Sequence, residues 1–366
     1  MFGAIEKRIS KALAAMRVDD LASDLAGAGV GIEVKTSGKR AFVTLITGFP
    51  CAGLQDGLIA QTRAAALAAG AESVDVNVQV RIQSHQAQNG MASLDAVKNV
   101  IAVASGKGGV GKSTTAVNLA LALVAEGARV GIMDADIHGP SQQMMLGVPK
   151  GTRPGIREEK YFEPVEALGL QSISMAYMVN DDTPMVMRGP KQSGALLQLV
   201  LQTLWHDLDY LVIDMPPGTG DIQLTLAQKI PVAGAVIVTT PQDIATLDAR
   251  RGIEMFRKVD ISVLGVVENM ALHVCSNCGQ VEHIFGAGGG ERIAREYQSE
   301  LLGSLPLDIK IREQADSGRP TVIAAPDSAV ALAYRRIARR VAARLAVRPV
   351  AGKRAFPKVV MTSTEE

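Results

Sequence analysis

The feature that most constrains this chain is a glycine-rich stretch, Gly106-Lys107-Gly108-Gly109-Val110-Gly111-Lys112-Ser113-Thr114. An apolar run from Val100 to Ala104 precedes it and predicts a buried strand, and a periodic helix is expected from Ser113 to Glu126. Strand, glycine loop and helix together are the context in which G-x-x-x-x-G-K-[ST] indicates a phosphate-binding loop. A chance glycine turn is the alternative, and the flanking strand and helix argue against it.

Each part of this loop suits a nucleoside triphosphate. Glycines let successive backbone N–H groups turn inward around phosphate oxygens, and the helix N-terminus adds partial positive charge. Lys112 is expected to reach the β- and γ-phosphates, and the hydroxyl of Ser113 is expected to bind Mg²⁺. We therefore predict that residues 106–114 bind ATP and Mg²⁺, with Lys112 taking part in hydrolysis.

A second lysine, Lys107, follows the first glycine of the loop, where an ordinary phosphate loop needs none. Its place resembles that of the signature lysine of the deviant Walker A ATPases, the group that contains MinD, ParA and the nitrogenase iron protein. The resemblance implies a homodimer in which Lys107 reaches the nucleotide of the facing subunit and acts in catalysis. A lysine that is simply solvated is the alternative.

The pattern after the loop predicts the fold class. Short apolar runs at 129–132, 210–213, 235–239 and 262–267 alternate with helical patterns. Such alternation is typical of an α/β fold in which helices cover both faces of a mostly parallel sheet. We expect a P-loop NTPase fold of this kind, preceded by a small α+β domain. Ligands of such sheets bind beyond the carboxyl ends of the strands, where Asp134 and Asp214 lie.

Two stretches at these strand ends supply carboxylates. Of Asp134 and Asp136, one could hold the Mg²⁺ shell and one could orient the attacking water, and we predict Asp136 for the water because it lies farther out in the loop. Asp214 is the Walker B candidate, which reaches Mg²⁺ through water, and the N–H of Gly218 could sense the γ-phosphate as part of a switch. Each carboxylate alone could instead be a helix cap. By resemblance to the same ATPase group, Asn269 reads the adenine edge and residues 306–308 lie on the other side of the base.

A cysteine pair, Cys275-Ser276-Asn277-Cys278, follows Asn269 in a loop. This chelate spacing supplies half of a four-cysteine site, and a two-fold dimer would complete it. Four thiolates can hold zinc or an iron–sulfur cluster, and the spacing does not choose between them. A redox pair and an inert loop are further interpretations. The third cysteine, Cys51, lies far away in the first domain.

The composition limits the classes of binding partner and the cellular compartment that we expect. Of 366 residues, 38 are basic and 37 acidic, so the formal net charge is +1 and does not call for nucleic acid or an anionic membrane. Aromatic residues make up only 4%, which argues against a base-stacking platform. Three cysteines fit a reducing compartment. No secretory signal and no apolar stretch of about 18 residues is apparent, so we expect a cytoplasmic protein.

We divide the chain into four parts. Residues 1–82 are expected to form the small α+β accessory domain, 83–98 a polar linker, 99–347 the ATPase domain, and 348–366 a disordered tail. The last helix, predicted from Asp327 to Leu345, has an apolar stripe with five arginines mainly off it. A core-docked helix with a solvated basic face is favoured over a membrane-binding helix.

In combination, these motifs resemble the Mrp/ApbC family of iron–sulfur cluster carrier ATPases from about Asn99 to Leu345. The resemblance implies that a labile [4Fe–4S] cluster bridges two subunits through Cys275 and Cys278. It also implies that weak ATPase activity is coupled to cluster loading or delivery, with a scaffold or donor protein and apo iron–sulfur proteins as partners. The first domain resembles the small domain that often precedes this ATPase, and Cys51 matches its cysteine. The usual Asp-Pro pair is missing, so this domain is degenerate and Cys51 is as well explained as a buried small residue.

Two rival functions remain open. One is a spatial organiser of the MinD or ParA kind, which would want a membrane helix or a basic DNA-binding surface. The other is a dimeric ATPase held together by zinc at the cysteine pair, with a structural role.

Overall fold

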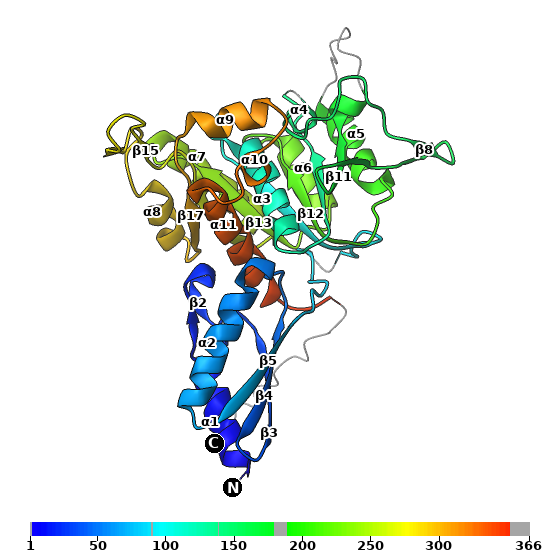
Figure 1. Cartoon of the computed structure of the whole chain (residues 1–366). Coiled ribbons are helices and arrows are strands. Elements are labelled where there is room, and N and C mark those ends of the chain that lie inside the picture. The colour runs from blue at the N-terminus through cyan, green and yellow to red at the C-terminus, as the bar shows by residue number, and fades with distance from the viewer. Residues whose placement is uncertain (1, 89–90, 138, 179–188, 352–366) are drawn as a thin grey trace, which may run out of the picture.

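The computed structural model describes residues 2–88, 91–137, 139–178 and 189–351. Figure 1 shows an elongated N-terminal unit below a larger α/β unit, with the last long helix, α11 (Ala329–Ala346), reaching the place where the two meet. Within the described part of the chain, no helix is long and apolar enough to cross a membrane.

The larger unit is built on an eight-stranded sheet of order β10-β11-β7-β12-β6-β13-β14-β17. All neighbouring pairs from β11 to β17 are parallel, and only β10 runs antiparallel, at one edge. The strands are β6 (Val97–Ala104), β7 (Val130–Asp134), β10 (Val165–Ala167), β11 (Leu170–Ser174), β12 (Leu208–Asp214), β13 (Gly234–Thr239), β14 (Val263–Glu268) and β17 (Leu301–Ser304). The predicted α/β class is confirmed.

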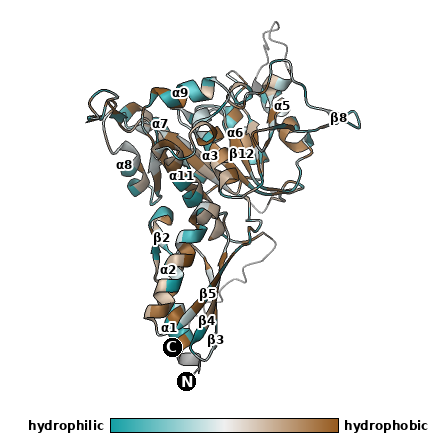
Figure 2. Ribbon diagram, in the orientation of Figure 1, coloured by the Kyte–Doolittle hydropathy of each residue, from teal (hydrophilic) through white to brown (hydrophobic). Residues whose placement is uncertain are grey.

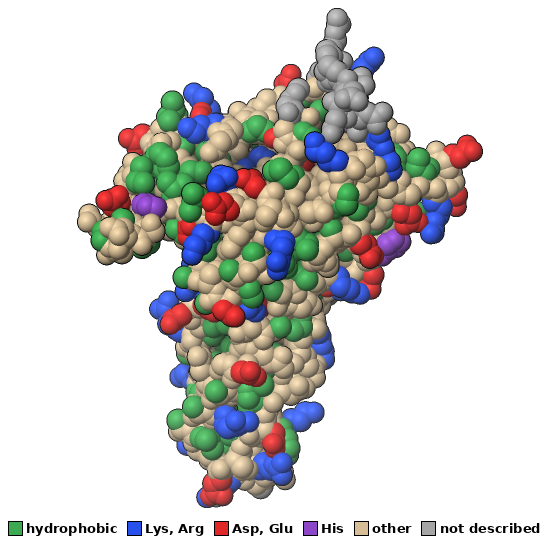
Figure 3. Space-filling view, turned by 45° about the horizontal axis from the view of Figure 1, so that its top comes forward, with side chains coloured by type: hydrophobic (Ala, Val, Ile, Leu, Met, Phe, Trp, Pro, Cys, Tyr) green, Lys and Arg blue, Asp and Glu red, His purple; other side chains and the backbone are tan. Residues whose placement is uncertain are grey.

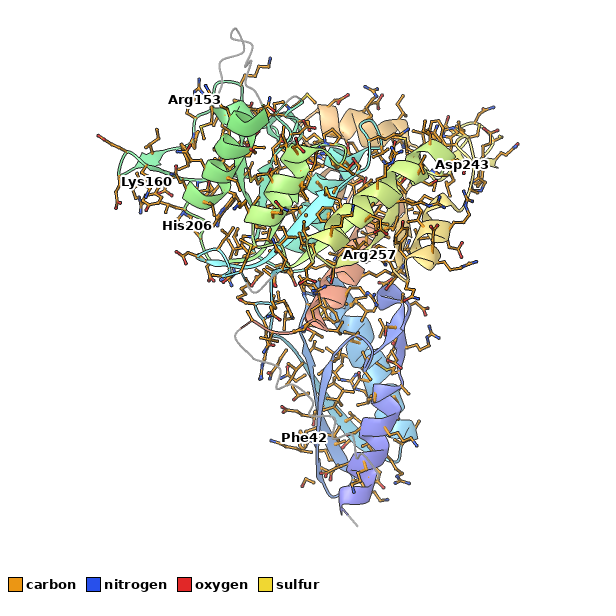
Figure 4. All side chains as sticks on the ribbon, turned by 180° about the vertical axis from the view of Figure 1, so that it is seen from behind. Phe42, Arg153, Lys160, His206, Asp243 and Arg257 are labelled. Atoms are coloured by element: carbon orange, nitrogen blue, oxygen red, sulfur yellow. The ribbon has the colours of Figure 1, made fainter. Side chains whose placement is uncertain are left out.

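Helices cover both faces of this sheet. On the face seen in Figure 1, α3 (Lys112–Ala125) and α11 pack against each other, and both contact the sheet, α3 over β7 and β12 and α11 over β14 and β17. The opposite face, seen in Figure 4, carries α5 (Gly189–Gln202), α6 (Asp221–Lys229) and α7 (Asp243–Lys258). Because the sheet is enclosed on both sides, every residue of β7, β12 and β13 is buried, and Figure 2 shows these strands as hydrophobic.

The N-terminal unit packs two helices on a three-stranded sheet. Strands β3 (Gly31–Ser37) and β4 (Arg40–Thr47) form an antiparallel hairpin, and β5 (Ser73–Val80) pairs with β4 in parallel. Helices α1 (Phe2–Ala14) and α2 (Gln55–Ala68) contact each other and the sheet, and α2 makes the crossover that the parallel pair requires. Short strands β1 (Arg17–Val18) and β2 (Ser23–Asp24) complete the unit.

The polar segment between the units is held against the larger one. Gln88 is buried, and its Nε2 donates to the carbonyl oxygens of Ala227 (2.7 Å) and Ile230 (2.5 Å) at the end of α6. His85 pairs with Val350 as an isolated β-bridge, so the chain beyond α11 returns to this segment. The expected disorder of the tail is therefore wrong for residues 348–351, and residues 352–366 lie outside the described part.

The arginines of α11 correct a second expectation. Arg339 is only 6% exposed, and its guanidinium forms ion pairs with Glu126 and Asp20. Arg335 pairs with the same oxygen of Glu126, and Arg340 donates to backbone carbonyls of the N-terminal unit and to Leu302. The expected basic face is solvated at Arg336 and Arg344, whereas its other arginines form the surface on which the N-terminal unit docks. We call the group Asp20, Glu126, Arg335 and Arg339 the joint cluster.

Candidate functional site

The phosphate loop connects β6, a central strand of the sheet, to α3. Two of its glycines are required by close approaches: a Cβ on Gly106 would lie 2.1 Å from the carbonyl carbon of Asp248 in α7, and one on Gly111 would lie 2.1 Å from Nδ2 of Asn269. Gly109 and Gly111 have φ of +80°, a conformation that favours glycine. Gly108 and Gly109 border open space, which leaves this side of the loop accessible.

Lys112, Ser113 and Asp214 meet at the start of α3. Lys112 is 6% exposed, and its ammonium group forms an ion pair with the fully buried carboxylate of Asp214 and donates to Oγ of Ser113 (3.1 Å). The structure therefore brings together the three side chains that the sequence assigns to the phosphates and to Mg²⁺.

Gln142 joins this group, although nothing in the sequence marks it as a site residue. It begins the short helix α4 (Gln142–Met145), and its Nε2 donates to Oδ2 of Asp214 (2.9 Å) and to the carbonyl oxygen of Ser113 (3.1 Å). The pattern after Asp134 has no periodicity that would point a side chain inward, so the contact arises only from the tertiary fold.

The two aspartates after β7 differ in their surroundings. The Asp134 carboxylate accepts hydrogen bonds from the backbone N–H groups of Asp136 (3.1 Å), Ser141 (2.9 Å) and Gln142 (3.0 Å), so it organises the loop. Asp136 is partly exposed, and its Oδ1 accepts the N–H of Gly139 (3.2 Å). The oxygens of Asp134 are thus occupied by backbone N–H groups, and Asp136 is the more accessible of the two carboxylates.

Burial and the carboxylate of Asp214 raise the pKa of Asp134 from 3.8 to about 7. These two residues are cross-strand partners at the ends of β7 and β12, which explains their mutual repulsion. Since the folded chain holds this proton more tightly than the unfolded chain, the stability it contributes is full below pH 3.8 and is lost as pH rises through about 7.

We predict that nucleotide-free wild type loses stability relative to the Asp134→Asn variant between pH 5 and pH 8, because only the wild type carries this titrating group. Urea unfolding at both pH values measures the difference. Parallel pH profiles for the two proteins would contradict this assignment of the titrating group.

The segment Pro216-Pro217-Gly218, in which Gly218 is expected to act as part of a switch, passes beside the phosphate loop. The N–H of Gly218 donates to the carbonyl oxygen of Ser105 (2.9 Å), and Nε2 of Gln223 donates to the carbonyl oxygen of Pro217. Gly218 has a φ of +96°, which favours glycine at this turn. A response of Gly218 to a γ-phosphate would require exchange of its bond to Ser105.

Beside the loop lies a cleft of about 410 Å³, largely apolar in its lining. Gly111, Ser113 and Thr114 form part of its wall, and Asn269, Met270 and residues 306–308 form another. Nδ2 of Asn269 donates to the carbonyl oxygen of Val110 (2.9 Å), which fixes this amide against the loop. The cleft therefore contains both segments that the sequence assigns to the two sides of a base.

The cysteine pair occupies the turn between β15 (His273–Val274) and β16 (Val281–Glu282). The N–H of Gly279 donates to the carbonyl oxygen of Cys275 (2.8 Å), and Gly279 has a φ of +74°. Backbone N–H groups of Cys278 and Asn277, together with the Cys278 side chain, lower the pKa of the Cys275 thiol. Cys275 is partly exposed and Cys278 is exposed, so this cysteine hairpin offers accessible sulfur atoms, one of them disposed to ionise.

The cysteine hairpin is hydrogen-bonded to a segment that also lines the cleft. It follows Asn269 and Met270 directly in the chain, and Nδ1 of His273 donates to the carbonyl oxygen of Leu307 (3.0 Å), a residue of the cleft wall. The N–H of Leu307 in turn donates to the carbonyl oxygen of Leu272 (2.7 Å). A displacement of the cleft wall would therefore be transmitted to the hairpin through these two hydrogen bonds.

Cys51 lies elsewhere, near the joint cluster. It is 1% exposed with its Sγ 3.6 Å from Oγ1 of Thr47, and burial raises the pKa of its thiol. In the part of the chain that the structure describes, no three His, Cys, Asp or Glu side chains are grouped to hold a metal ion. One chain therefore contributes two thiols at the cysteine hairpin, and Cys51 behaves as a buried small residue.

A phosphate loop at the carboxyl edge of a mostly parallel sheet, with a buried aspartate ending the neighbouring strand, defines a P-loop NTPase. Comparison with known sequences narrows this class. The chain belongs to the ParA family described as NUBPL iron-transfer P-loop NTPase, whose sequence model matches residues 96–342.

Similar proteins include two named iron–sulfur cluster carrier protein. The one from Pseudomonas fragi is 66% identical over 269 residues, which cover 74% of this chain and 94% of that protein. The one from Deinococcus radiodurans is 42% identical over 339 residues, covering 92% and 95%. Among solved structures, a nucleotide-binding protein from Archaeoglobus fulgidus in complex with ADP is 38% identical, with a TM-score of 0.55 over 62% of this chain and 88% of that one.

Proposed function

We propose that this protein is an ATP-dependent iron–sulfur cluster carrier, which holds a [4Fe–4S] cluster as cargo between two subunits and transfers it to apo proteins. The observation that carries the proposal is the cysteine hairpin. It offers accessible thiols and is hydrogen-bonded to the wall of the nucleotide cleft. The names of the P. fragi and D. radiodurans relatives support the same cargo.

The groups around Ser113 fit Mg²⁺ with a bound nucleotide. A hydroxyl and a carboxylate are the oxygen donors that Mg²⁺ prefers, and Oε1 of Gln142 is a further buried oxygen with no hydrogen-bond partner among the described residues. Ser113 would hold the ion directly and Asp214 through water, and the ion would neutralise charge on the phosphates. The ADP in the A. fulgidus structure supports a nucleotide here.

The chain's own residues then have distinct tasks in weak ATP hydrolysis. Residues 106–114 cradle the phosphates with backbone N–H groups, and Lys112 moves from Asp214 to the β- and γ-phosphates. Asp136 orients the attacking water, and the N–H of Gly218 senses the γ-phosphate. Asn269 contacts the adenine edge, because it lines the cleft beside the loop.

A homodimer completes both sites. Lys107 is partly exposed, and its ammonium group has no hydrogen-bond or ion-pair partner among the residues the structure describes, which leaves it able to reach a facing nucleotide. Around the cysteine hairpin, toward the left of Figure 3, three large apolar side chains are about half exposed: Val274, Val281 and Ile284. Two copies placed with these surfaces together would supply four thiolates to one cluster.

Anaerobic reconstitution with iron and sulfide tests the proposal. We predict that the wild type binds about four iron atoms per dimer and transfers them to an apo iron–sulfur acceptor. The Cys275→Ala/Cys278→Ala variant should lose this iron and sulfide, because it lacks all accessible thiols, whereas the matched Cys51→Ala variant should keep them.

Two results would overturn the proposal. One is a double variant that holds as much iron and sulfide as the wild type. The other is anaerobically purified protein that contains one zinc per dimer without sulfide, which would favour a structural metal site instead.

A further inference from the structure

We propose that Gln142 is a positioning residue for Mg²⁺, which acts by orienting Asp214 and by accepting a hydrogen bond from a water of the ion's shell. The inference rests on the nucleotide site proposed above. Its first support is burial: the Gln142 side chain is 1% exposed, although a glutamine gains nothing from burial unless its amide is bonded.

The amide nitrogen of Gln142 is fully used. It donates to Oδ2 of Asp214 (2.9 Å) and to the carbonyl oxygen of Ser113 (3.1 Å), so it joins the two residues that would hold the ion. Lys112 occupies the other oxygen of Asp214. When Lys112 leaves for the phosphates, Gln142 remains as the donor that keeps the Asp214 carboxylate in place.

The amide oxygen of Gln142 is the second support. Oε1 is buried and has no hydrogen-bond partner among the described residues. A buried acceptor left unpaired is destabilising, and proteins retain one mainly where something else occupies the position. Because Nε2 of the same amide faces the Mg²⁺ candidates Ser113 and Asp214, a water bound to the ion is the donor whose chemistry fits this oxygen.

Asp134 fixes Gln142 in this position. Its Oδ2 accepts the backbone N–H groups of Ser141 and Gln142, so the start of α4 is tied to the end of β7. The sequence of contacts Asp134, Gln142, Asp214 thus links the loop after β7 to the site of the ion. The amide can both donate to Asp214 through Nε2 and accept a hydrogen bond through Oε1.

The test measures the affinity of a fluorescent ADP analogue with Mg²⁺ and with chelator in wild type, Gln142→Met and Gln142→Glu. Methionine keeps the length of the side chain and removes both hydrogen-bonding groups. Glutamate adds a charge that repels phosphates and attracts the cation. Gln143→Ala is the matched control, because Gln143 is the next residue of α4 and its Nε2 donates to the carbonyl oxygen of Pro149.

We expect the tightening of ADP binding by Mg²⁺ to fall about tenfold in Gln142→Met, as for other residues that support a metal's ligands. Binding without Mg²⁺ should stay near the wild-type value. In Gln142→Glu the tightening should increase, and in Gln143→Ala it should not change. A purely structural role would not move the two Gln142 variants in opposite directions.

Equal tightening in all four proteins, or equal losses with and without Mg²⁺ in both Gln142 variants, would overturn the inference while leaving the nucleotide site intact. Wild type that does not bind ADP would instead overturn the proposed nucleotide site itself. Thermal melting identifies a variant that fails to fold. In that case, the direction in which Mg²⁺-dependent tightening changes in the other Gln142 variant tests the inference.

Discussion

Replacing Lys112 by alanine should abolish ATP hydrolysis while leaving cluster binding largely intact. Lys112 is the cation at the start of α3 expected on the β- and γ-phosphates, and loss of one preorganised charge-stabilising group lowers turnover by about 100-fold or more. The fold should persist, because the Asp214 carboxylate keeps Gln142 as a hydrogen-bond donor. Phosphate release measures the first effect, and iron and sulfide content measures the second.

Lys98 provides the matched control for this result. It lies on β6, the strand that leads into the phosphate loop, and pairs with Asp209 at the opposite end of the sheet from the loop. Lys98→Ala should therefore hydrolyse ATP at close to the wild-type rate. Cluster binding should survive because the hydrogen bonds between Leu307 and both His273 and Leu272, which hold the cysteine hairpin, do not involve Lys112. Parallel loss of hydrolysis and cluster in Lys112→Ala would contradict this and would show that the two sites cannot be separated structurally.

The features that could be predicted from the sequence are those with a local pattern. The phosphate loop has fixed glycines whose neighbours in space, Asp248 and Asn269, explain why no side chain fits there. The strands β6, β7 and β12 each contain a short continuous apolar run because they are covered on both faces, so they can be predicted without the fold.

The features that could not be predicted depend on contacts between distant segments. Gln142 and Asp214 are 72 positions apart, and the polar stretch around Gln142 does not indicate which side chains point inward. The sequence distinguishes Asp134 from Asp136 only by position in the loop, and the three backbone N–H groups that Asp134 accepts come from the tertiary fold. The apolar stripe of α11 indicates that its arginines point away from the core of the larger unit. It does not indicate that the N-terminal unit packs against them.

These arginines connect the nucleotide site to the N-terminal unit through one helix. Helix α3 begins at Lys112 in the phosphate loop, and Glu126, directly after its last residue, belongs to the joint cluster. Oε2 of Glu126 also accepts the N–H of Gly53 (2.9 Å), and the N–H of Ala52 donates to its carbonyl oxygen (3.1 Å). A movement of α3 on nucleotide binding would therefore displace Glu126 and alter the contacts of the joint cluster with the N-terminal unit.

Replacing Glu126 by alanine should cause the largest loss of stability of any single substitution in this joint. The Glu126 carboxylate is fully buried and accepts hydrogen bonds from Nε of Arg335 and Nη2 of Arg339, both at 2.7 Å. Among the described residues, removing it leaves the buried guanidinium of Arg339 with Asp20 as its one ionic partner, and removing one member of a buried ion pair costs about 3 kcal/mol or more. The urea midpoint should fall, and limited proteolysis should release the N-terminal unit first.

Two variants make this result specific to the joint cluster. Glu313→Ala removes an exposed carboxylate of α9 (Ile309–Asp316) that pairs with exposed Arg312, and it should change stability by less than about 1 kcal/mol. Glu126→Leu combined with Arg339→Met removes both buried charges and should be more stable than Glu126→Ala alone, because no guanidinium is then buried without its carboxylate. If Glu126→Ala were no less stable than Glu313→Ala, the joint cluster would not hold the two units together, and α3 would lose its proposed route from the phosphates to the N-terminal unit.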